Sequence, residues 1–411
     1  MENSKKIVIV GGGFGGIRAA LDLAGKQLPN AKIILINDKP HFEYHPALYR
    51  VVTGQSPLEV CIPLREIFIG KNVEILEDTI IKVNLKEKLL KGSSDSHYSF
   101  DFLILALGSE TAYFNIPGLK EFSFGFKSIN EALRLKKHLH EFFNIYTKVA
   151  PEERACRAHI IVAGGGASGT ELAGEIAIYS KKFARNYKFN PSLVTIDLIE
   201  AAARLLPALP DDISKKVENR LHQLRVNIFL NQTVVKEDIK EAYLKNMEMK
   251  TKTVIWTAGI KPHHLYSQIK GLTFDNKRRV MVDKFLQAQK WNNVFVIGDA
   301  ASTPYAGMAQ TAIHDGQFVA KVIERKLFSG RQIHPYQPKP PFYAIPVGSG
   351  WAAVMIGNLR FYGKIGWWLR RIADLQFFLS ILPWCKAISA FQSGKTLCES
   401  CAICLPEEVV D

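Results

Sequence analysis

The chain has 411 residues, of which 47% are hydrophobic and 22% are charged. This length and composition predict two or three folded domains and exclude disorder on a large scale. The 53 basic residues outnumber the 39 acidic ones, and the net charge of +14 favours an anionic partner such as a cofactor or a membrane surface. We expect no nucleic-acid partner, because the sequence contains no arginine-rich arm, zinc-finger spacing or RNA-binding motif.

The N-terminus and the overall hydropathy bear on location. The six residues that precede the first apolar run are too few for a signal peptide. No run of 18 or more uncharged apolar residues occurs, so no ordinary membrane span is expected. The six cysteines fit a reducing compartment. The sequence therefore predicts a protein that stays in the cytoplasm.

A glycine-rich turn lies near the N-terminus. Residues 7–10 are β-branched and predict a buried strand, whereas residues 17–23 favour a helix. The turn between them fits G-x-G-x-x-G, in which the glycines allow the tight turn, the approach of a pyrophosphate and the packing of helix on strand. We predict that it binds a dinucleotide at the helix N-terminus. The candidate residues are Gly11, Gly13, Phe14, Gly15 and Gly16.

The second predicted strand, residues 32–36, ends at Asn37 and Asp38. In dinucleotide-binding folds a side chain at this point accepts hydrogen bonds from the adenosine ribose. Either residue can reach the ribose, so both remain candidates. The aromatic-rich residues 41–49 follow, and they are either part of the site or a surface loop with core aromatics.

A further strand is predicted over residues 98–106, closing at Gly108. A glycine directly after a buried strand allows a cofactor to approach closely, so Gly108 is a candidate binding residue. The Pro-Gly pair at 117–118 punctuates a crossing between domains. A helix is predicted over residues 128–146.

A second copy of the opening design begins at residue 160. A strand over residues 160–163 leads into a glycine turn and a helix, and the strand over 193–199 ends at Glu200. A carboxylate there repels a 2′-phosphate and favours NADH over NADPH, although Arg204 is a weak signal to the contrary. Two such fingerprints imply two dinucleotides, usually FAD and NAD(P)H. The candidates here are Gly164, Gly166, Gly169 and Glu200.

The segments that follow deliver further candidates at strand ends. A helix is predicted over residues 206–224, and a strand over 253–259 stops at Gly259. The strand at residues 293–300 presents Gly298 and Asp299, where the carboxylate either binds a polyol hydroxyl of FAD or belongs to an ordinary turn. Residues 309–324 predict another helix.

Together these segments resemble the two-dinucleotide flavoproteins of the glutathione-reductase type, and most closely the type II NADH:quinone oxidoreductases. The resemblance extends from residue 5 to about 325 and rests on residues 11–16, 42–49, 105–109, 116–118, 164–175, 256–259, 298–299 and 309–310. It implies an α/β fold with two Rossmann-like domains. The FAD domain would comprise residues 1–114 and 261–330, with the NADH domain, residues 115–260, inserted into it.

The resemblance also implies roles for particular side chains. Glu171 would lie near the flavin and the nicotinamide. Ala309 and Gln310 begin a segment similar to the family's quinone-site motif Ala-Gln-x-Ala-x-Gln, but His314 stands in place of the second glutamine. A histidine can hydrogen-bond a quinone carbonyl and supply a proton near neutral pH. Alternatively, His314 is an ordinary helix-surface residue.

The implied reaction is hydride transfer from NADH to FAD, followed by electron transfer to a membrane quinone without proton pumping. No closely spaced cysteine pair occurs in either βα unit, which argues against a disulfide reductase. A sulfide:quinone oxidoreductase is less favoured, because Cys61 and Cys156 lie outside the motifs of that family. Two further possibilities are a reductase of a soluble acceptor such as ferredoxin or rubredoxin, and a non-enzymatic dinucleotide sensor.

The C-terminal region, residues 331–411, begins with a proline-rich linker. Residues 364–384 predict an amphipathic helix that lies in a membrane interface, with Arg370 and Arg371 turned toward anionic lipid. The alternative is a helix packed in a core or in a homodimer interface. We expect a peripheral protein on the cytoplasmic face of the cell membrane. The apolar stripe comprises Ile365, Trp368, Leu369, Ile372, Leu375, Leu379 and Leu382.

The tail contains Cys398, Cys401 and Cys404 in a C-x2-C-x2-C pattern. The spacing is similar to that of iron–sulfur ligands, and thiolates also bind zinc. A fourth nearby cysteine is missing, and Cys385 would have to reach back. We therefore expect no metal and a flexible, thiol-bearing tail.

Overall fold

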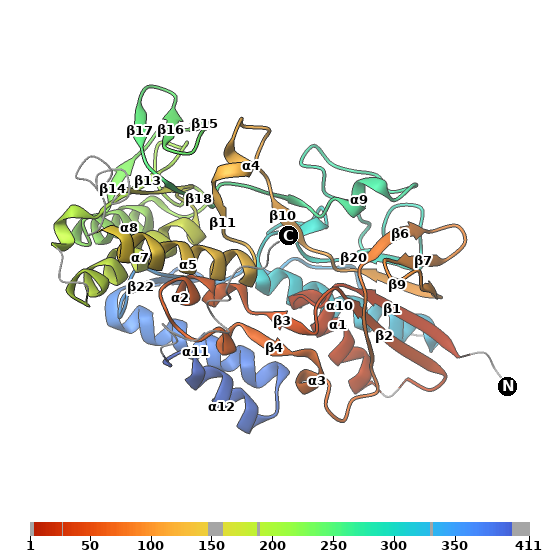
Figure 1. The fold of residues 1–411 in the computed structure, drawn as a ribbon. Coiled ribbons are helices and arrows are strands. Elements are labelled where there is room, and N and C mark those ends of the chain that lie inside the picture. Colours follow the sequence, from red (N-terminus) through yellow and green to blue (C-terminus); the bar gives the residue numbers. More distant parts are fainter. Residues whose placement is uncertain (1–3, 27, 147–158, 187–189, 329–331, 397–411) are drawn as a thin grey trace.

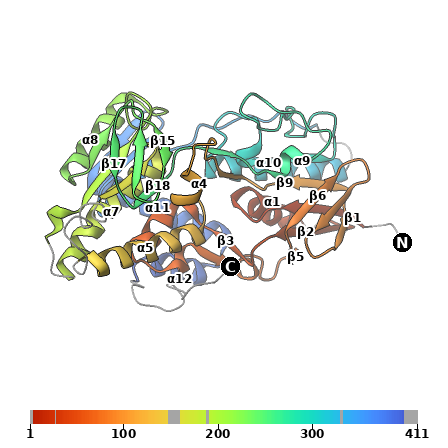
Figure 2. The same ribbon diagram turned by 45° about the horizontal axis from the view of Figure 1, so that its top comes forward.

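The structure, a computed structural model, describes residues 4–26, 28–146, 159–186, 190–328 and 332–396. Two five-stranded parallel sheets lie side by side, as Figures 1 and 2 show. A C-terminal unit contacts elements around both sheets. The expected α/β fold with two Rossmann-like units is confirmed.

The first sheet has the strand order β20-β9-β1-β2-β5. Because both of its faces are covered, its central strands β1, β2 and β9 contain continuous apolar runs. One face packs on α1 (Phe14–Gly25) and α10 (Ala309–Leu327), and the other lies under an antiparallel sheet of three short strands. The parallel sheet consists of β1 (Lys5–Val10), β2 (Ala31–Asn37), β5 (Glu74–Glu77), β9 (Phe102–Leu105) and β20 (Val294–Val296). The antiparallel sheet consists of β6 (Ile80–Asn84), β7 (Leu89–Gly92) and β8 (His97–Ser99).

The second sheet has the order β11-β18-β12-β13-β14 and repeats this plan. Three helices, α5 (Ile129–Tyr146), α7 (Ala167–Asn186) and α8 (Asp211–Gln223), accompany it, and a second antiparallel sheet covers its other face. The strands are β11 (Phe124–Gly125), β12 (His159–Ala163), β13 (Thr195–Ile199), β14 (Asn227–Phe229) and β18 (Thr253–Trp256), then β15 (Val234–Glu237), β16 (Glu241–Leu244) and β17 (Glu248–Lys250).

Two strands connect the sheets. The chain leaves the first sheet through β10 (Ser109–Thr111) and returns through β19 (Ile260–Pro262), and these two strands pair antiparallel. The other short helices and strands before residue 270 are β3 (His41–Glu43), α2 (Leu48–Val52), β4 (Cys61–Pro63), α3 (Leu64–Ile67), α4 (Leu119–Phe122) and α9 (Leu265–Gln268).

Two elements differ from their predicted extent. The helix predicted from residue 206 begins at Asp211, because Pro207 and Pro210 disfavour helical conformation in the residues before them. The strand predicted over residues 98–106 is divided into β8 and β9. Asp101 lies between them, and its carboxylate accepts a hydrogen bond from the backbone N–H of Lys6 at 2.8 Å.

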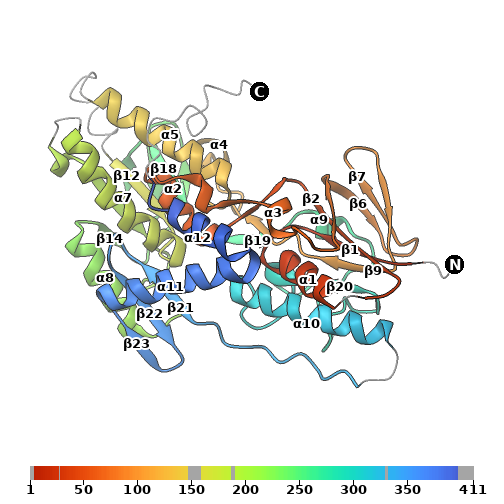
Figure 3. The same cartoon turned by 90° about the horizontal axis from the view of Figure 1, so that it is seen from below.

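The C-terminal unit contains the antiparallel strands β21 (Tyr343–Pro346), β22 (Ala352–Ile356) and β23 (Leu359–Phe361), then α11 (Gly363–Ile381) and α12 (Trp384–Ser393). Figure 3 shows the linker running back along α10 to reach β21, with α11 and α12 on the lower face. The sequence did not predict α12. None of the helices in the described part of the chain combines the length and hydrophobicity of a membrane span. The cysteine-rich tail lies outside the described residues.

Candidate active site

The first glycine turn leaves a concave backbone surface at the start of α1. Gly11 has φ +107°, a conformation that favours glycine. A Cβ on Gly16 would lie 1.9 Å from the carbonyl oxygen of Gly11, so only glycine lets α1 approach β1 this closely. The backbone N–H of Gly12 donates to Asn37 Oδ1 at 2.6 Å, which fixes the turn against the end of β2.

The second turn has the same construction at the start of α7. Gly164 has φ +118°, and a Cβ on Gly169 would lie 1.8 Å from the carbonyl oxygen of Gly164. The Glu200 carboxylate accepts hydrogen bonds from Gly165 N–H at 2.6 Å and from Ala202 N–H at 2.7 Å. Both fingerprints therefore present free backbone N–H groups at a helix start, the arrangement that binds a pyrophosphate.

Both turns border one large cleft, of about 1250 Å³. The cleft is long enough to touch β1, β2, the segment after β9, the crossing strands, α7, α10 and α11, so groups held by either sheet meet in it. Fourteen of the predicted site residues line it: Gly11, Gly13, Phe14, Gly15, Asn37, Asp38, Gly108, Gly166, Glu171, Gly259, Gly298, Asp299, Ala309 and Gln310.

The remaining five predicted residues do not line the cleft. Three of them, Gly16, Gly164 and Gly169, shape the turns from behind, where a side chain would collide with backbone. Glu200 likewise stands behind its turn and holds it through the two hydrogen bonds described above. His314 lies elsewhere.

The structure places His314 on a face of α10 that does not line the cleft. Its Nε2 lies 3.0 Å from the carbonyl oxygen of Gln337 in the linker, and its ring lies beside Tyr336. One residue advances a helix by about 100°, so Gln310 and Ile313 can line the cleft while His314 does not. The expectation of a direct catalytic role is not supported by this position. His314 joins α10 to the linker.

Gln310 has a double role. It lines the cleft, and its side-chain amide donates to the carbonyl oxygen of Phe342 at 3.0 Å and accepts from the N–H of Phe342 at 3.1 Å. Asp315, five residues further along α10, accepts from Tyr336 Oη at 2.5 Å and from the N–H of Gly298 at 2.9 Å. These side chains hold the linker, and Asp315 also positions the Gly298–Asp299 turn.

Glu171 brings a carboxyl group into the cleft from the first turns of α7. Burial raises its pKa to about 8, against the lowering influence of Arg370 and Arg50. Burial also raises the pKa of Glu175, one turn further along α7, to about 7. Glu175 does not line the cleft. Glu171 is therefore a group that holds a proton at neutral pH at the cleft wall.

A buried ionic network beneath Glu171 was not predicted. Arg50 contacts Glu59 at 2.6 Å and Asp374 at 3.0 Å, and Arg371 contacts Glu59 at 2.8 Å and Asp374 at 3.2 Å. Arg370 pairs with Asp374 and lines the cleft. The prediction that both arginines of α11 point toward lipid is therefore wrong, because they pair with carboxylates in the interior. Their spacing to Asp374, three and four residues, was the available signal.

Aromatic rings form an apolar wall between the first turn and α11. The Phe14 ring lies 4.9 Å from that of Phe42 and 5.1 Å from that of Phe377, and Tyr44 stacks on Phe377 at 5.0 Å. Phe14, Tyr44 and Phe377 line the cleft. This part of the cleft suits a flat, apolar group.

Polar groups gather at Asp299 in another part of the cleft. Its carboxylate accepts from Ser109 Oγ and lies 3.6 Å from Lys127 Nζ. Both partners line the cleft as well. The sequence predicted Asp299 but neither partner, because Lys127 comes from a segment more than 170 positions earlier in the chain.

The described thiols stand apart from this chemistry. Cys61 and Cys385 are free, and neither lines the cleft. Burial raises the pKa of Cys61 to about 12, which keeps the thiol protonated and unreactive. Cys156 lies outside the described residues.

The comparisons with known proteins agree with this architecture. The chain is 28% identical to the type II NADH:quinone oxidoreductase Ndh of Mycobacterium tuberculosis, over 95% of this chain and 89% of that protein. The corresponding protein of Haemophilus influenzae is 28% identical over 72% of this chain and 74% of its own length. Among solved structures, NDH2 from Plasmodium falciparum in complex with NADH superposes with a TM-score of 0.87 at 20% identity, covering 95% of this chain and 97% of that one.

A sulfide:quinone oxidoreductase from Aquifex aeolicus also shares the fold, with a TM-score of 0.76, 18% identity and coverage of 94% and 92%. At these identities the two solved structures establish the fold alone. The model of one protein family, pyridine nucleotide-disulphide oxidoreductase, matches residues 5–316, well over half of the chain. The protein therefore belongs to the pyridine nucleotide-disulphide oxidoreductase family.

Proposed function

We propose that this protein is a type II NADH:quinone oxidoreductase, which oxidises NADH through FAD and reduces a membrane quinone without pumping protons. The observation that carries the proposal is the single cleft that borders both glycine turns, the Glu171 carboxyl group and an aromatic wall. A nicotinamide, a flavin and an apolar acceptor can meet in one such space. The named relatives support the same reading.

The residues present fit FAD in the first half of the cleft. The turn at residues 11–16 would hold the pyrophosphate, Asn37 or Asp38 the adenosine ribose, and Asp299 the polyol chain. A side chain at Gly13 would meet open space, so the backbone there is accessible to a ligand. FAD, when bound, supplies the hydride-accepting ring and passes electrons on.

The second turn fits NADH. The backbone at Gly166 is equally open, and Leu206, Pro207, Ala208 and Leu209 form the adjoining wall. Arg204 donates to the carbonyl oxygens of Leu209 at 2.7 Å and Pro207 at 2.8 Å. Since this guanidinium is engaged in holding the wall, it is a poor candidate to bind a 2′-phosphate. Together with Glu200, this favours NADH over NADPH.

The acceptor would enter along the aromatic wall between Phe14 and Phe377. A quinone ring is flat and apolar, with two carbonyl oxygens that need hydrogen-bond donors. Gln310 and Glu171, which is protonated at neutral pH, offer such donors in the same cleft. The described thiols do not reach the cleft, which disfavours sulfide oxidation.

We further propose that α11 binds the cytoplasmic face of the membrane. Five large apolar side chains on α11 and at the start of α12 are exposed, whereas Arg370, Arg371 and Asp374 of α11 face the interior. An apolar stripe of this kind, with two tryptophans, suits the interface between headgroups and acyl chains. The exposed residues are Ile365, Trp368, Ile372, Leu379 and Trp384.

The experiment is an anaerobic titration of the flavin-loaded protein, followed at the visible flavin absorbance band. NADH should bleach the band, and a short-chain quinone should restore it rapidly. If quinone does not restore the band but oxidised ferredoxin or rubredoxin does, the acceptor is a soluble protein. A band that NADH does not bleach would contradict the enzymatic proposal and favour a sensor.

A further inference from the structure

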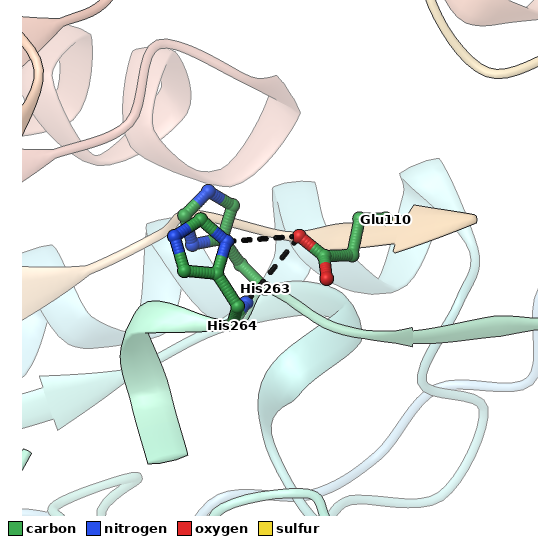
Figure 4. A group of neighbouring side chains, drawn as sticks. All are labelled: Glu110, His263 and His264. Atoms are coloured by element: carbon green, nitrogen blue, oxygen red, sulfur yellow. Dashed lines mark hydrogen bonds and ion pairs between the residues drawn. The ribbon is translucent and has the colours of Figure 1, made fainter. Parts of the chain in front are cut away.

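A cluster of three metal-ligating side chains lies where the chain crosses between the two sheets. Glu110 belongs to β10, and His263 and His264 follow β19 directly. Their candidate ligand atoms all lie within 4.8 Å of one another. Figure 4 shows the three side chains together. We propose that Glu110, His263 and His264 form a binding site for a divalent ion of the zinc class. This inference does not depend on the proposed function.

The pairing of the two strands creates the cluster. In their antiparallel register Glu110 is opposite Lys261, and the N–H of His263 continues the pairing by donating to the carbonyl oxygen of Gly108 at 3.2 Å. The two imidazole rings therefore lie beside the carboxylate, with their centroids 4.3 Å apart. The pairing brings Glu110 and His263 together, and the chain turns at His264 into α9, which keeps the second ring beside the carboxylate.

The distances suit a tetrahedral ion after small side-chain movements. His264 Nδ1 lies 3.1 Å from Glu110 Oε2. Metal–ligand bonds of about 2.0–2.2 Å place neighbouring ligand atoms of a tetrahedron about 3.4 Å apart. An ion would replace this hydrogen bond and draw in the second ring. Two imidazoles and one carboxylate form a known zinc ligand set that leaves a fourth position for water.

Neighbouring groups hold the ligands in place and also set a limit on cation binding. His263 Nδ1 accepts from the backbone N–H of Leu265 at 3.3 Å, which holds the ring in place. The Glu110 carboxylate lies between two basic side chains, His264 and Lys261. Lys261 Nζ lies 3.0 Å from the second carboxylate oxygen, Oε1. This ammonium engages Oε1 and repels a cation, whereas Oε2 also accepts from the backbone N–H of His264 at 3.4 Å.

The location gives the site a consequence. Glu110 and His263 line the rim of the large cleft, and β10 and β19 are the strands that connect the two sheets. An ion held by both strands would tie them together at the cleft mouth. His264 is the ligand that does not line the cleft, so its replacement tests the metal separately from the rest of the site.

The test measures zinc binding by competition with a chromophoric chelator. It uses the full-length protein with Cys398, Cys401 and Cys404 replaced by serine, which removes the tail thiols as zinc ligands. We expect one zinc ion per chain at pH 7.5, with the affinity at least about tenfold weaker in His264→Ala and in Glu110→Gln. The matched control is His222→Ala, because His222 is an exposed histidine beside a glutamate, at 3.8 Å from Glu218.

Lys261→Met supplies a test in the opposite direction, since removal of the competing ammonium should strengthen zinc binding severalfold. This gain cannot arise from misfolding. The proposal is overturned if the protein binds no zinc, or if His264→Ala binds it as well as His222→Ala does. It is also overturned if Lys261→Met leaves the affinity unchanged.

Discussion

Glu171 is a carboxylic acid whose protonation is set by its position at the cleft wall. Burial raises its pKa to about 8. It therefore carries a proton at neutral pH and loses it as the pH rises through 8. A protonated carboxyl group beside the aromatic wall can donate a hydrogen bond or a proton to an acceptor, which an ionised one cannot do.

We expect Glu171→Gln to lower quinone-reductase turnover at pH 7 by at least about tenfold, because a general acid contributes about 10²–10⁴ to a rate. Wild-type turnover should fall as the pH rises through about 8, and the variant should lack this break. Steady-state kinetics between pH 6 and 9 measure both effects. An unchanged pH profile in the variant would exclude Glu171 as the titrating group.

The matched control is Glu175→Gln, one helical turn away and outside the cleft, which should retain turnover within about twofold.

Both variants should be more stable than the wild type at pH 8. A carboxyl group whose folded-state pKa is raised loses stability as the pH climbs from its unfolded value, 4.5, toward the folded one. Thermal unfolding should show a higher Tm for the variants than for the wild type at pH 8, and no such difference at pH 4.5.

Glu200 is the residue that we propose sets the choice between NADH and NADPH, although it does not line the cleft. Its carboxylate is held by two backbone N–H groups at the end of β13, where an adenosine ribose would lie. Glu200→Gln keeps the side-chain length and removes the negative charge. We expect kcat/KM for NADPH relative to NADH to rise at least about tenfold. Arg204→Gln should not raise this ratio, and a rise there would show that Arg204 binds the 2′-phosphate.

The elements α10 and α11 illustrate what the sequence could and could not predict. The sequence predicted both helices, and for α11 the basis was an apolar stripe, which is a local signal. The stripe did not reveal which face of α11 is buried. Its charged residues are buried because Arg50 and Glu59, more than 300 positions earlier, provide partners that the local sequence does not contain. On α10, Ile313 lines the cleft and His314, the next residue, does not. The local sequence did not reveal which of these two neighbours faces the cleft.

The network on α11 makes a prediction for stability. Asp374 is fully buried and is shared by Arg50, Arg370 and Arg371. Asp374→Ala leaves three guanidinium groups with a single carboxylate, and breaking a buried pair in this way costs about 3–5 kcal/mol. We expect a fall in Tm of several degrees. The exposed pair of Lys386 and Glu66, at 3.1 Å, is the control, and Lys386→Ala should cost less than about 1 kcal/mol. Equal losses in both variants would refute the structural role of the network.

At the scale of the whole molecule, the sequence predicted the two nucleotide-binding units but not how they share one cleft. Each glycine fingerprint is a local pattern, so the two turns could be located residue by residue. The cleft depends on the crossing of β10 and β19 and on a linker that runs back along α10 to β21 and α11. Lys127 and Arg370 reach the cleft only through this tertiary arrangement, and no local motif marks them.

The membrane proposal depends on this arrangement as well, because the exposed stripe is apolar while the arginines of α11 are buried. Ile365, Trp368 and Ile372 are 64%, 62% and 57% exposed. Replacing all three with serine should reduce co-sedimentation with anionic phospholipid vesicles at least about tenfold, since burial of this apolar surface drives binding. Bleaching of the flavin band by NADH should persist. A triple serine variant at Leu193, Val235 and Ile239, which are also exposed, should bind vesicles normally. Equal binding by both variants would show that another surface meets the membrane.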